Sequence, residues 1–244
     1  YKRQTGTYAA FLANRISHHF GWRGESVTVD TACASSLTAL HLARHALLRS
    51  SIDCCIVGGV NVLISPWRSV AFSHAGMLSP QGFCKTFSDQ ADGYVPGEGI
   101  VVLVLKRTRD AIKSGDRILG LMHGSAINHM GETPTLTSPS VKAESTLIRR
   151  ALEEAGIDPN LISYVECHGT GTPLGDPIEV EALAQVLSSQ RVFIGSVKSN
   201  LGHLEAAAGL AGVAKVLLML RHRMIPPTLH IQNDNPLIDF DHLN

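Results

Sequence analysis

Hydrophobic positions along the chain form short apolar runs that have the length and composition of β-strands. Ser26–Asp30 alternates apolar and polar residues and is rich in β-branched side chains, whereas Cys54–Ile64 and Ile100–Arg107 are nearly continuous apolar runs. Continuous runs of this kind are typical of strands that helices cover on both faces of a sheet. The pattern therefore predicts a sheet that lies between helical layers.

Between these runs, apolar residues recur at the spacing of amphipathic helices. Two of the helical segments stop at a glycine, Gly115 and Gly156, which is a common helix end. The last segment is apolar nearly all round and is therefore expected to be buried. The four predicted helices are Ala34–Leu48, Thr108–Ser114, Ser140–Ala155 and Ala206–Leu220.

Further strands are predicted in the second half of the chain. Arg117–Asn128 has the pattern of a strand, Leu161–Thr170 that of a strand running into a turn, and Phe193–His203 that of a short strand followed by a loop. Asn128–Ser138 has the least pattern and is predicted to be a loop. Strands that alternate with helices indicate a fold of the α/β class.

Composition and charge exclude several classes of protein. The 244 residues include 21 Lys+Arg and 21 Asp+Glu, so the formal net charge is zero and no nucleic-acid partner is expected. The longest apolar stretch, Gly209–Leu220, is shorter than the roughly 18 residues that span a membrane, and Lys215 interrupts it. We therefore expect no membrane association.

The cysteines and the first residues indicate the setting of the protein. Five cysteines form no CxxC pair, which argues against disulfides and a structural zinc site and indicates a reducing, cytoplasmic location. The sequence starts YKRQTGTY, with neither an initiator Met nor a signal-peptide pattern. We therefore expect a piece of a longer polypeptide.

Cys33 is the first candidate for chemistry, because it lies between small residues where a predicted strand gives way to a helix. The partial positive charge and free N–H groups of a helix N-terminus favour a thiolate and are expected to lower the pKa of this thiol. A free cysteine is also among the most commonly buried residues, so a purely structural thiol fits the same position. The location alone leaves both interpretations open.

Two histidines and one lysine lie at strand or loop ends, where functional sites are often built. His168 follows a predicted strand in ECHGTGTPLGD, and His203 precedes the last helix in VKSNLGHLEAAAG. Lys198 lies five residues before His203 in a segment of small and apolar residues, so a buried, paired lysine and an ordinary surface lysine both fit this position.

Two other patterns carry less weight. His41 and His45 share one helix face, but no HExxH glutamate or third ligand accompanies them, so no metal site is predicted. The stretch GTGTPLG, Gly169–Gly175, lacks both the GxGxxG spacing and a following Lys-Ser/Thr of nucleotide-binding loops. No cofactor-binding residue is therefore predicted.

Three long motifs resemble the active-site motifs of β-ketoacyl synthases. They are VDTACASSL around Cys33, ECHGTGTPLGDPIE around His168 and SVKSNLGHLEAAAG around His203. The flanking RISHHFGWRG, FSHAGMLSPQG, FSDQADGYVPGEG and IPPTLH extend the resemblance to ketosynthase domains of modular type I polyketide synthases. GYVPGEG, with Pro96, and NHMGETPTLTSPS resemble the synthases whose acyltransferases act in trans.

The resemblance implies a thiolase-like fold with α-β-α-β-α layers, here an incomplete fragment, and a homodimer. Residues 1–116 would belong to the N-terminal half with Cys33, and residues 117–244 to the C-terminal half with His168 and His203. The implied reaction is a decarboxylative Claisen condensation between acyl and malonyl-type thioesters on acyl carrier protein.

The same resemblance assigns a role to each site residue. Cys33 would carry the acyl chain as a thioester, while His168 and His203 donate N–H bonds to the oxygen of the decarboxylating extender. Lys198, paired with Glu179, would orient the histidines. Thr170 and Thr172 would contact the phosphopantetheine arm of the carrier. The domain itself would bind no cofactor.

Other functions remain open beside elongation. A ketosynthase-like gatekeeper that only passes acyl chains on typically lacks the histidine that is present here as His168. A fatty-acid synthase ketosynthase shares the three motifs, and a Cys-His hydrolase would need an acid to orient its base. The family's C-terminal GFGGTN-like loop, which supplies an oxyanion-hole N–H, is absent from the 244 residues. We therefore expect this piece alone to fold poorly or to be inactive.

Overall fold

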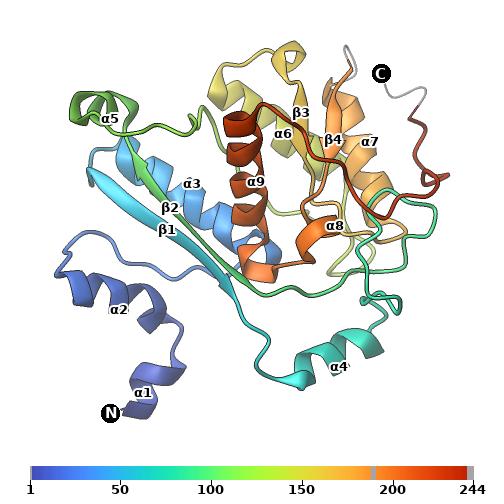
Figure 1. The fold of residues 1–244 in the computed structure, drawn as a ribbon, viewed down its shortest axis with the longest axis horizontal. Helices are drawn as coiled ribbons and strands as arrows, with labels where there is room; N and C mark the ends of the chain where they lie inside the picture. The colour runs from blue at the N-terminus through green and yellow to red at the C-terminus, as the bar shows by residue number, and fades with distance from the viewer. Residues whose placement is uncertain (1, 188–190, 241–244) are drawn as a thin grey trace.

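The computed structural model describes residues 2–187 and 191–240, and Figure 1 shows helices around two short sheets. The mixed α/β class predicted from the sequence is confirmed. The outer ends of the two predicted halves, residues 1 and 241–244, lie outside the described residues. In chain order the elements are α1 Lys2–Thr7, α2 Ala10–Phe20, η1 Ala32–Ala34, α3 Ser35–Leu48, β1 Cys54–Asn61, α4 Pro66–His74, β2 Gly99–Lys106, α5 Thr108–Ser114, α6 Val141–Ala155, η2 Pro159–Leu161, β3 Tyr164–Glu166, α7 Gly175–Leu187, β4 Phe193–Gly195, α8 Lys198–Leu201, η3 Glu205–Ala207 and α9 Ala208–His222, where η marks a 3-10 helix.

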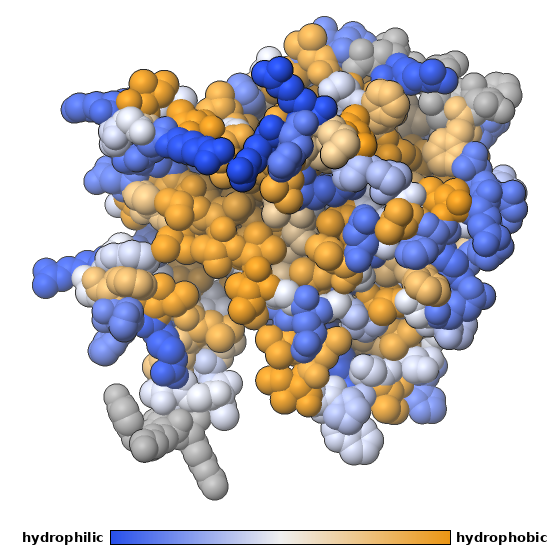
Figure 2. All heavy atoms as spheres, viewed as in Figure 1, coloured by the Kyte–Doolittle hydropathy of each residue, from blue (hydrophilic) through white to orange (hydrophobic). Residues whose placement is uncertain are grey.

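Strands β1 and β2 form an antiparallel pair in which Cys54 faces Lys106 and Asn61 faces Gly99. Side chains alternate between the two faces of this pair, and the inner face packs on α3 and α9 through Val57. The outer face stays exposed in the described part of the chain, for example at Ile100 and Val104, which are 69% and 71% exposed. Figure 2 shows apolar side chains gathered over this part of the molecule. The predicted cover on both faces is therefore wrong for the residues described.

Strands β3 and β4 form a parallel pair, and α7 lies between them in the chain as the connection that parallel strands require. Helices α6 and α7 pack on each other, and the core beneath them includes Phe87, Cys167, Val180 and Leu183. Because β3 and β4 are parallel, the segments that follow them in the chain start at the same edge of this pair. These segments contain His168 and His203.

Helix α9 joins the two sheets, because it contacts α3, β1 and β2 on one side and β3 on the other. Its N-terminal part is buried, with Leu210 completely enclosed, and the Leu210 N–H donates to Ser36 Oγ across 3.2 Å. The last turns are different, since Leu218 and Leu220 are 53% and 59% exposed. The prediction of a wholly buried helix is therefore correct only for the half nearest the site.

Two predicted strands are wrong. Ser26–Asp30 and Arg117–Asn128 have no strand geometry among the described residues, because a strand needs a hydrogen-bonded neighbour and neither segment has one there. The loop predicted after β4 contains the short helix α8, whereas Asn128–Ser138 is free of helix and strand, as predicted. In the part of the chain described, no helix is long and apolar enough to cross a membrane.

Candidate active site

Cys33, His168 and His203 converge in one place, although they lie far apart in the sequence. One ligand-type atom from each, a sulfur and two ring nitrogens, lies within 4.8 Å of the other two. The two imidazole rings meet edge to face, with their centroids 5.4 Å apart. The structure thus brings together the three residues that the motifs identified.

Cys33 is held in the 3-10 turn η1, directly before α3. The preceding Ala32 has a φ of +51°, a conformation that needs support in a residue with a side chain. That support comes from Asp30 Oδ1, which accepts the Ala32 N–H at 3.1 Å, and from Ser35 Oγ, which donates to the Ala32 carbonyl at 2.6 Å. The turn is therefore fixed on both sides of the thiol.

The pKa of the Cys33 thiol is raised rather than lowered. Burial is the largest cause, the Glu205 carboxylate adds to it, and the Lys198 ammonium opposes it. The lowered pKa expected from the helix N-terminus is therefore not found, because desolvation and a nearby negative charge both disfavour the thiolate. The resting side chain is a protonated thiol.

His203 is the most strongly held of the three residues and is 1% exposed. Its backbone N–H donates to the Val95 carbonyl at 2.6 Å, and its carbonyl accepts the Gly97 N–H at 2.8 Å. The Glu205 N–H donates to His203 Nδ1 at 2.8 Å, so the ring proton lies on Nε2. Burial, followed by the charges of Lys198 and Arg68, lowers the pKa of His203 to about 3, so the ring is neutral at pH 7.

His168 stands at the end of β3 and keeps an exposed edge. Surrounding atoms still desolvate the ring, which together with Lys198 and His203 holds the pKa of His168 well below its ordinary value. The site therefore contains two neutral imidazoles beside one thiol.

Lys198 and Glu179 hold the backbone of His168 from two directions. The Lys198 ammonium donates to the His168 carbonyl at 2.5 Å, and the Glu179 carboxylate accepts the N–H groups of His168 and Gly169 at 2.6 and 2.8 Å. Among the described residues, Lys198 and Glu179 form no direct ion pair, but the charge of each one favours the ionised form of the other. Both groups act through the same peptide segment, because each satisfies a backbone group that burial would otherwise leave unpaired.

Thr170 and Thr172 belong to the same loop, with their hydroxyl oxygens 3.2 Å apart. Thr170 is 8% exposed and Thr172 is half-buried. Gly169 precedes them with a φ of +42°, and a Cβ there would lie 2.6 Å from Thr86 and 2.7 Å from Ser196. Their contact with a phosphopantetheine arm stays a prediction, but the loop that carries them is tightly built.

Four residues that lie close to the site were not predicted from the sequence. Asp176, 1% exposed, accepts the N–H groups of Phe87 and Gly171 and shapes the loop after His168. The Tyr94 ring lies 4.9 Å from that of His203, and Arg68 forms an ion pair with the buried Glu205. Only Glu205 had a visible signal, an acid inside the apolar stretch HLEAAAG. The other contacts depend on tertiary folding.

The sulfur of Cys33 and the imidazoles of His168 and His203 are also ligand types that commonly bind zinc. A metal needs the lone pair of each ring nitrogen that binds it. His203 Nδ1 already accepts the Glu205 N–H, which leaves the ring proton on Nε2, so neither ring nitrogen has a free lone pair for a metal. The arrangement therefore fits a donor of hydrogen bonds better than a metal ligand.

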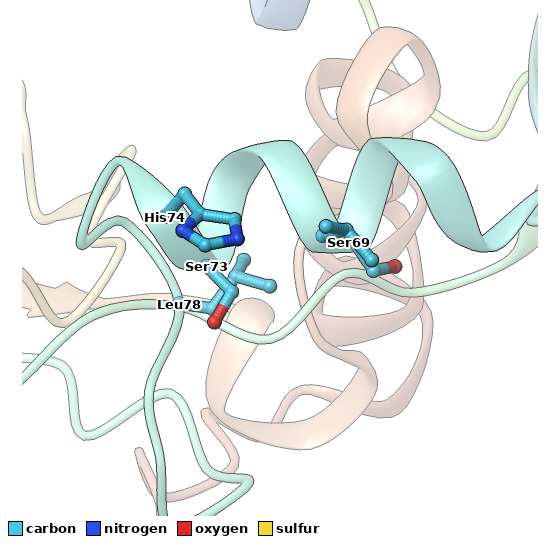
Figure 3. Close-up of a pocket in the computed structure, with 5 residues that line it drawn as sticks. Ser69, Ser73, His74 and Leu78 are labelled. Carbon is cyan, nitrogen blue, oxygen red and sulfur yellow. The ribbon is translucent and has the colours of Figure 1, made fainter.

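A hollow on the surface lies elsewhere. Figure 3 shows it beside α4, with Ser69, Ser73, His74 and Leu78 around it. The hollow contains none of the three converging residues, so it is not the reacting centre.

Comparison with known proteins gives one family over almost the whole chain. The N-terminal domain of β-ketoacyl synthase matches residues 1–111, and the C-terminal domain of β-ketoacyl synthase matches residues 119–232. Polyketide synthase ThaG of Burkholderia thailandensis is 50% identical over 242 residues, which cover 96% of this chain and 4% of that protein. Polyketide synthase PksL of Bacillus subtilis is 48% identical over 243 residues, 98% of this chain and 5% of that protein.

Solved structures agree with the sequence comparison. The ketosynthase from module 6 of the bacillaene synthase of Bacillus subtilis 168 has a TM-score of 0.95 at 47% identity, covering 98% of this chain and 43% of that one. The oxazolomycin ketosynthase domain OzmH KS7 of Streptomyces albus JA3453 has a TM-score of 0.93 at 43% identity, covering 96% and 43%. The chain thus spans a small part of the curated relatives and less than half of the solved ketosynthase chains.

Proposed function

The chain belongs to the β-ketoacyl synthase family, as a ketosynthase of the modular type I polyketide synthase kind, and we propose that it performs decarboxylative Claisen condensation. The observation that carries this proposal is the meeting of one thiol and two neutral imidazoles within 4.8 Å. A carbon–carbon bond formed by loss of CO2 needs these two functions together: a group that holds an acyl chain, and donors that stabilise an enolate.

In the first step Cys33 takes an acyl chain from acyl carrier protein. The sulfur of Cys33 attacks the carrier thioester carbonyl, the bond from that carbonyl to the phosphopantetheine sulfur breaks, and the thiol proton ends on the departing sulfur. A thiolate suits this step because it is both a nucleophile and a leaving group. The raised pKa of Cys33 means that the thiol must give up its proton for the attack, because the resting thiolate is disfavoured.

In the second step a malonyl-type extender on its carrier loses CO2, and the electrons of the broken bond move to the thioester oxygen. The N–H groups of His168 and His203 donate to that oxygen, each worth roughly 3–4 kcal/mol by analogy with oxyanion-hole donors in other enzymes. The His203 donor is Nε2–H, supported by the backbone bond to Nδ1. The enolate carbon then attacks the acyl carbonyl on Cys33, the new carbon–carbon bond forms, and the Cys33 thiolate leaves and is reprotonated.

Several finer features belong to the same proposal. The layers would be those of the thiolase-like α-β-α-β-α fold, divided at residue 116, and two copies would form a homodimer. Thr170 and Thr172 would contact the phosphopantetheine arm. Pro96 in GYVPGEG supports an assembly line whose acyltransferases act in trans, because this motif resembles ketosynthases of that kind.

Two other functions compete with elongation by a polyketide synthase. A gatekeeper ketosynthase would acylate Cys33 without releasing CO2 from malonyl carrier, and the presence of His168 favours elongation instead. A fatty-acid synthase ketosynthase would perform the same chemistry, but the two curated relatives described are both polyketide synthases.

The proposal is tested by CO2 release in the full-length protein with malonyl carrier, comparing wild type with His168→Ala and His203→Ala. We expect each variant to lose about 100- to 1,000-fold in rate, because one donor to the enolate oxygen is gone. The exposed His74 provides the control, and His74→Ala should keep the wild-type rate. Normal CO2 release by both site variants would contradict the mechanism.

A further inference from the structure

Glu205 lies beside the proposed site but takes no part in the chemistry described above. Its φ is +47°, an unusual backbone conformation for a residue with a side chain. From this conformation its N–H reaches His203 Nδ1 at 2.8 Å and fixes the tautomer of the ring. Something must hold Glu205 in this conformation, because strained backbones persist only where their surroundings determine them.

The side chain of Glu205 is 7% exposed, which is unusual for a carboxylate. One oxygen, Oε2, lies 2.9 Å from Nη2 of Arg68. The other, Oε1, is buried and has no hydrogen-bond partner among the residues that the structure describes. The carboxylate is also close to Cys33 and Tyr94, since its charge raises the pKa of both groups.

Arg68 reaches this carboxylate from a weakly attached helix. Helix α4, which carries it, has no buried residue among those described, and the Arg68 side chain is 46% exposed. The guanidinium carbon lies 5.2 Å from the centre of the Phe72 ring, and Nη1 donates to Asn61 Oδ1 at 3.5 Å. These contacts aim the guanidinium at Glu205 from the surface.

We propose that Arg68 is a positioning residue of the ketosynthase site, because it balances the buried charge of Glu205 and thereby holds both the His203 contact and the charge beside Cys33. This inference rests on the proposed function only in naming Cys33 as the nucleophile. Arg68 touches no reacting atom. It acts mainly through Glu205, and its own charge has a smaller direct effect on Cys33 and His203.

The physical reason is the cost of an uncompensated buried carboxylate. Without Arg68, the Glu205 carboxylate keeps no cation paired with it in the described structure, and its negative charge beside Cys33 is no longer balanced. An ionised Glu205 without its partner disfavours the Cys33 thiolate more strongly. A Glu205 that turns away gives up its strained backbone, and His203 then loses the bond to Nδ1.

The test is the rate at which iodoacetamide alkylates Cys33 in the full-length protein between pH 6 and 10, resolved by mass spectrometry of the Cys33 peptide. Below the thiol pKa the rate follows the thiolate fraction, so Arg68→Ala should react about fivefold more slowly than wild type. Glu205→Gln should react as fast as wild type or faster. The double variant Arg68→Ala/Glu205→Gln should recover most of the rate of Glu205→Gln, because the buried charge that needs balancing is gone and only the weaker direct effect of the Arg68 charge on Cys33 is lost.

Two controls separate charge from folding. Trp67→Ala removes the 77% exposed neighbour of Arg68 on the same helix and should leave the pH profile unchanged. Arg68→Lys keeps the positive charge and should lie closer to wild type than Arg68→Ala does. If Arg68→Ala fails to fold, the comparison of Glu205→Gln with wild type still decides, since a slower Glu205→Gln variant overturns the proposal.

Other outcomes also overturn it. They are an Arg68→Ala profile equal to wild type, a double variant as slow as Arg68→Ala, and a Trp67→Ala variant as slow as Arg68→Ala. Alkylation does not depend on acyl transfer, so failure of this proposal is distinct from failure of the proposed function. The latter shows as a protein whose Cys33 alkylates normally but accepts no acyl group from the carrier.

Discussion

The two sides of the candidate site are held in different ways. The side built from β3, β4, α8 and α9 anchors His168 and His203 through hydrogen bonds that involve backbone groups. The α4 side reaches the site through the guanidinium of Arg68, on a helix without a buried residue among those described. We infer that the first side fixes the positions of the two histidines and stabilises the fold. The α4 side adjusts the charge near Cys33, and substitutions on α4 should cost little stability.

The largest expected effect is on the buried side. The Lys215 ammonium lies 2.7 Å from Glu166 Oε2, with side chains 8% and 10% exposed, and Glu166 Oε1 accepts the Val197 N–H at 2.5 Å. Lys215→Ala should therefore lower the free energy of unfolding by about 3 kcal/mol, because it leaves a buried carboxylate unpaired. Urea denaturation measures this change.

Lys113 supplies the control for that variant, because it is exposed, and Lys113→Ala should change stability by less than about 0.5 kcal/mol. Replacing both members of the buried pair, as Lys215→Met with Glu166→Gln, should recover part of the loss. If Lys215→Ala were as stable as wild type, the α9 side of the site would be no more important for stability than the α4 side, which would contradict the comparison.

Lowering the pH should also reduce the free energy of unfolding through His203, by a smaller amount than Lys215→Ala does. The pKa of His203 is about 3 in the folded chain and about 6.5 in an unfolded one. The unfolded state therefore binds more protons between these values, so the contribution of His203 is complete above pH 6.5 and is lost as the pH falls toward 3.

From pH 7 to pH 5 this histidine alone should take about 2 kcal/mol from the free energy of unfolding. Urea titrations at pH 7, 6 and 5 measure the loss. In His203→Gln, which cannot titrate, the slope should be shallower. A slope that is the same in both proteins would show that His203 is not held neutral by its surroundings.

The smallest effect is expected on the α4 side. Trp67 is 77% exposed, so Trp67→Ala removes little buried surface and should change the free energy of unfolding by less than about 0.5 kcal/mol. Thermal or urea denaturation of this variant beside wild type measures the change. A loss as large as that of Lys215→Ala would mean that α4 is as firmly anchored as α9.

Local signals in the sequence were enough for much of the fold. The helices Thr108–Ser114 and Val141–Ala155 were predicted to within a residue, because Gly115 and Gly156 adopt the left-handed conformation that ends them. The Ser26–Asp30 segment was misjudged, since β-branched composition indicates a strand but cannot supply the neighbouring strand that pairs with it.

Motifs in the sequence also identified the main residues of the site, whereas their electrostatics and several contacts depend on tertiary folding. Cys33, His168 and His203 were identified through their motifs, and the structure brings them together. The raised pKa of Cys33 could not be predicted from its helix N-terminus, because Glu205 and burial act through space. Lys198 and Glu179 were expected to form a pair, and in the structure the peptide between His168 and Gly169 lies between their charges. Contacts between distant segments, such as Arg68 with Glu205, left no local pattern.

The central claim is that Cys33 carries the acyl chain. The most direct measurement incubates the full-length protein with an acyl-loaded carrier protein and maps the added mass by peptide mass spectrometry, with Cys33→Ala and the exposed-thiol variant Cys54→Ala beside wild type. We predict an acyl group on the Cys33 peptide in wild type and Cys54→Ala, and none on Cys33→Ala. Acylation of Cys33→Ala equal to wild type, or an acyl group found only on another cysteine, would contradict the account.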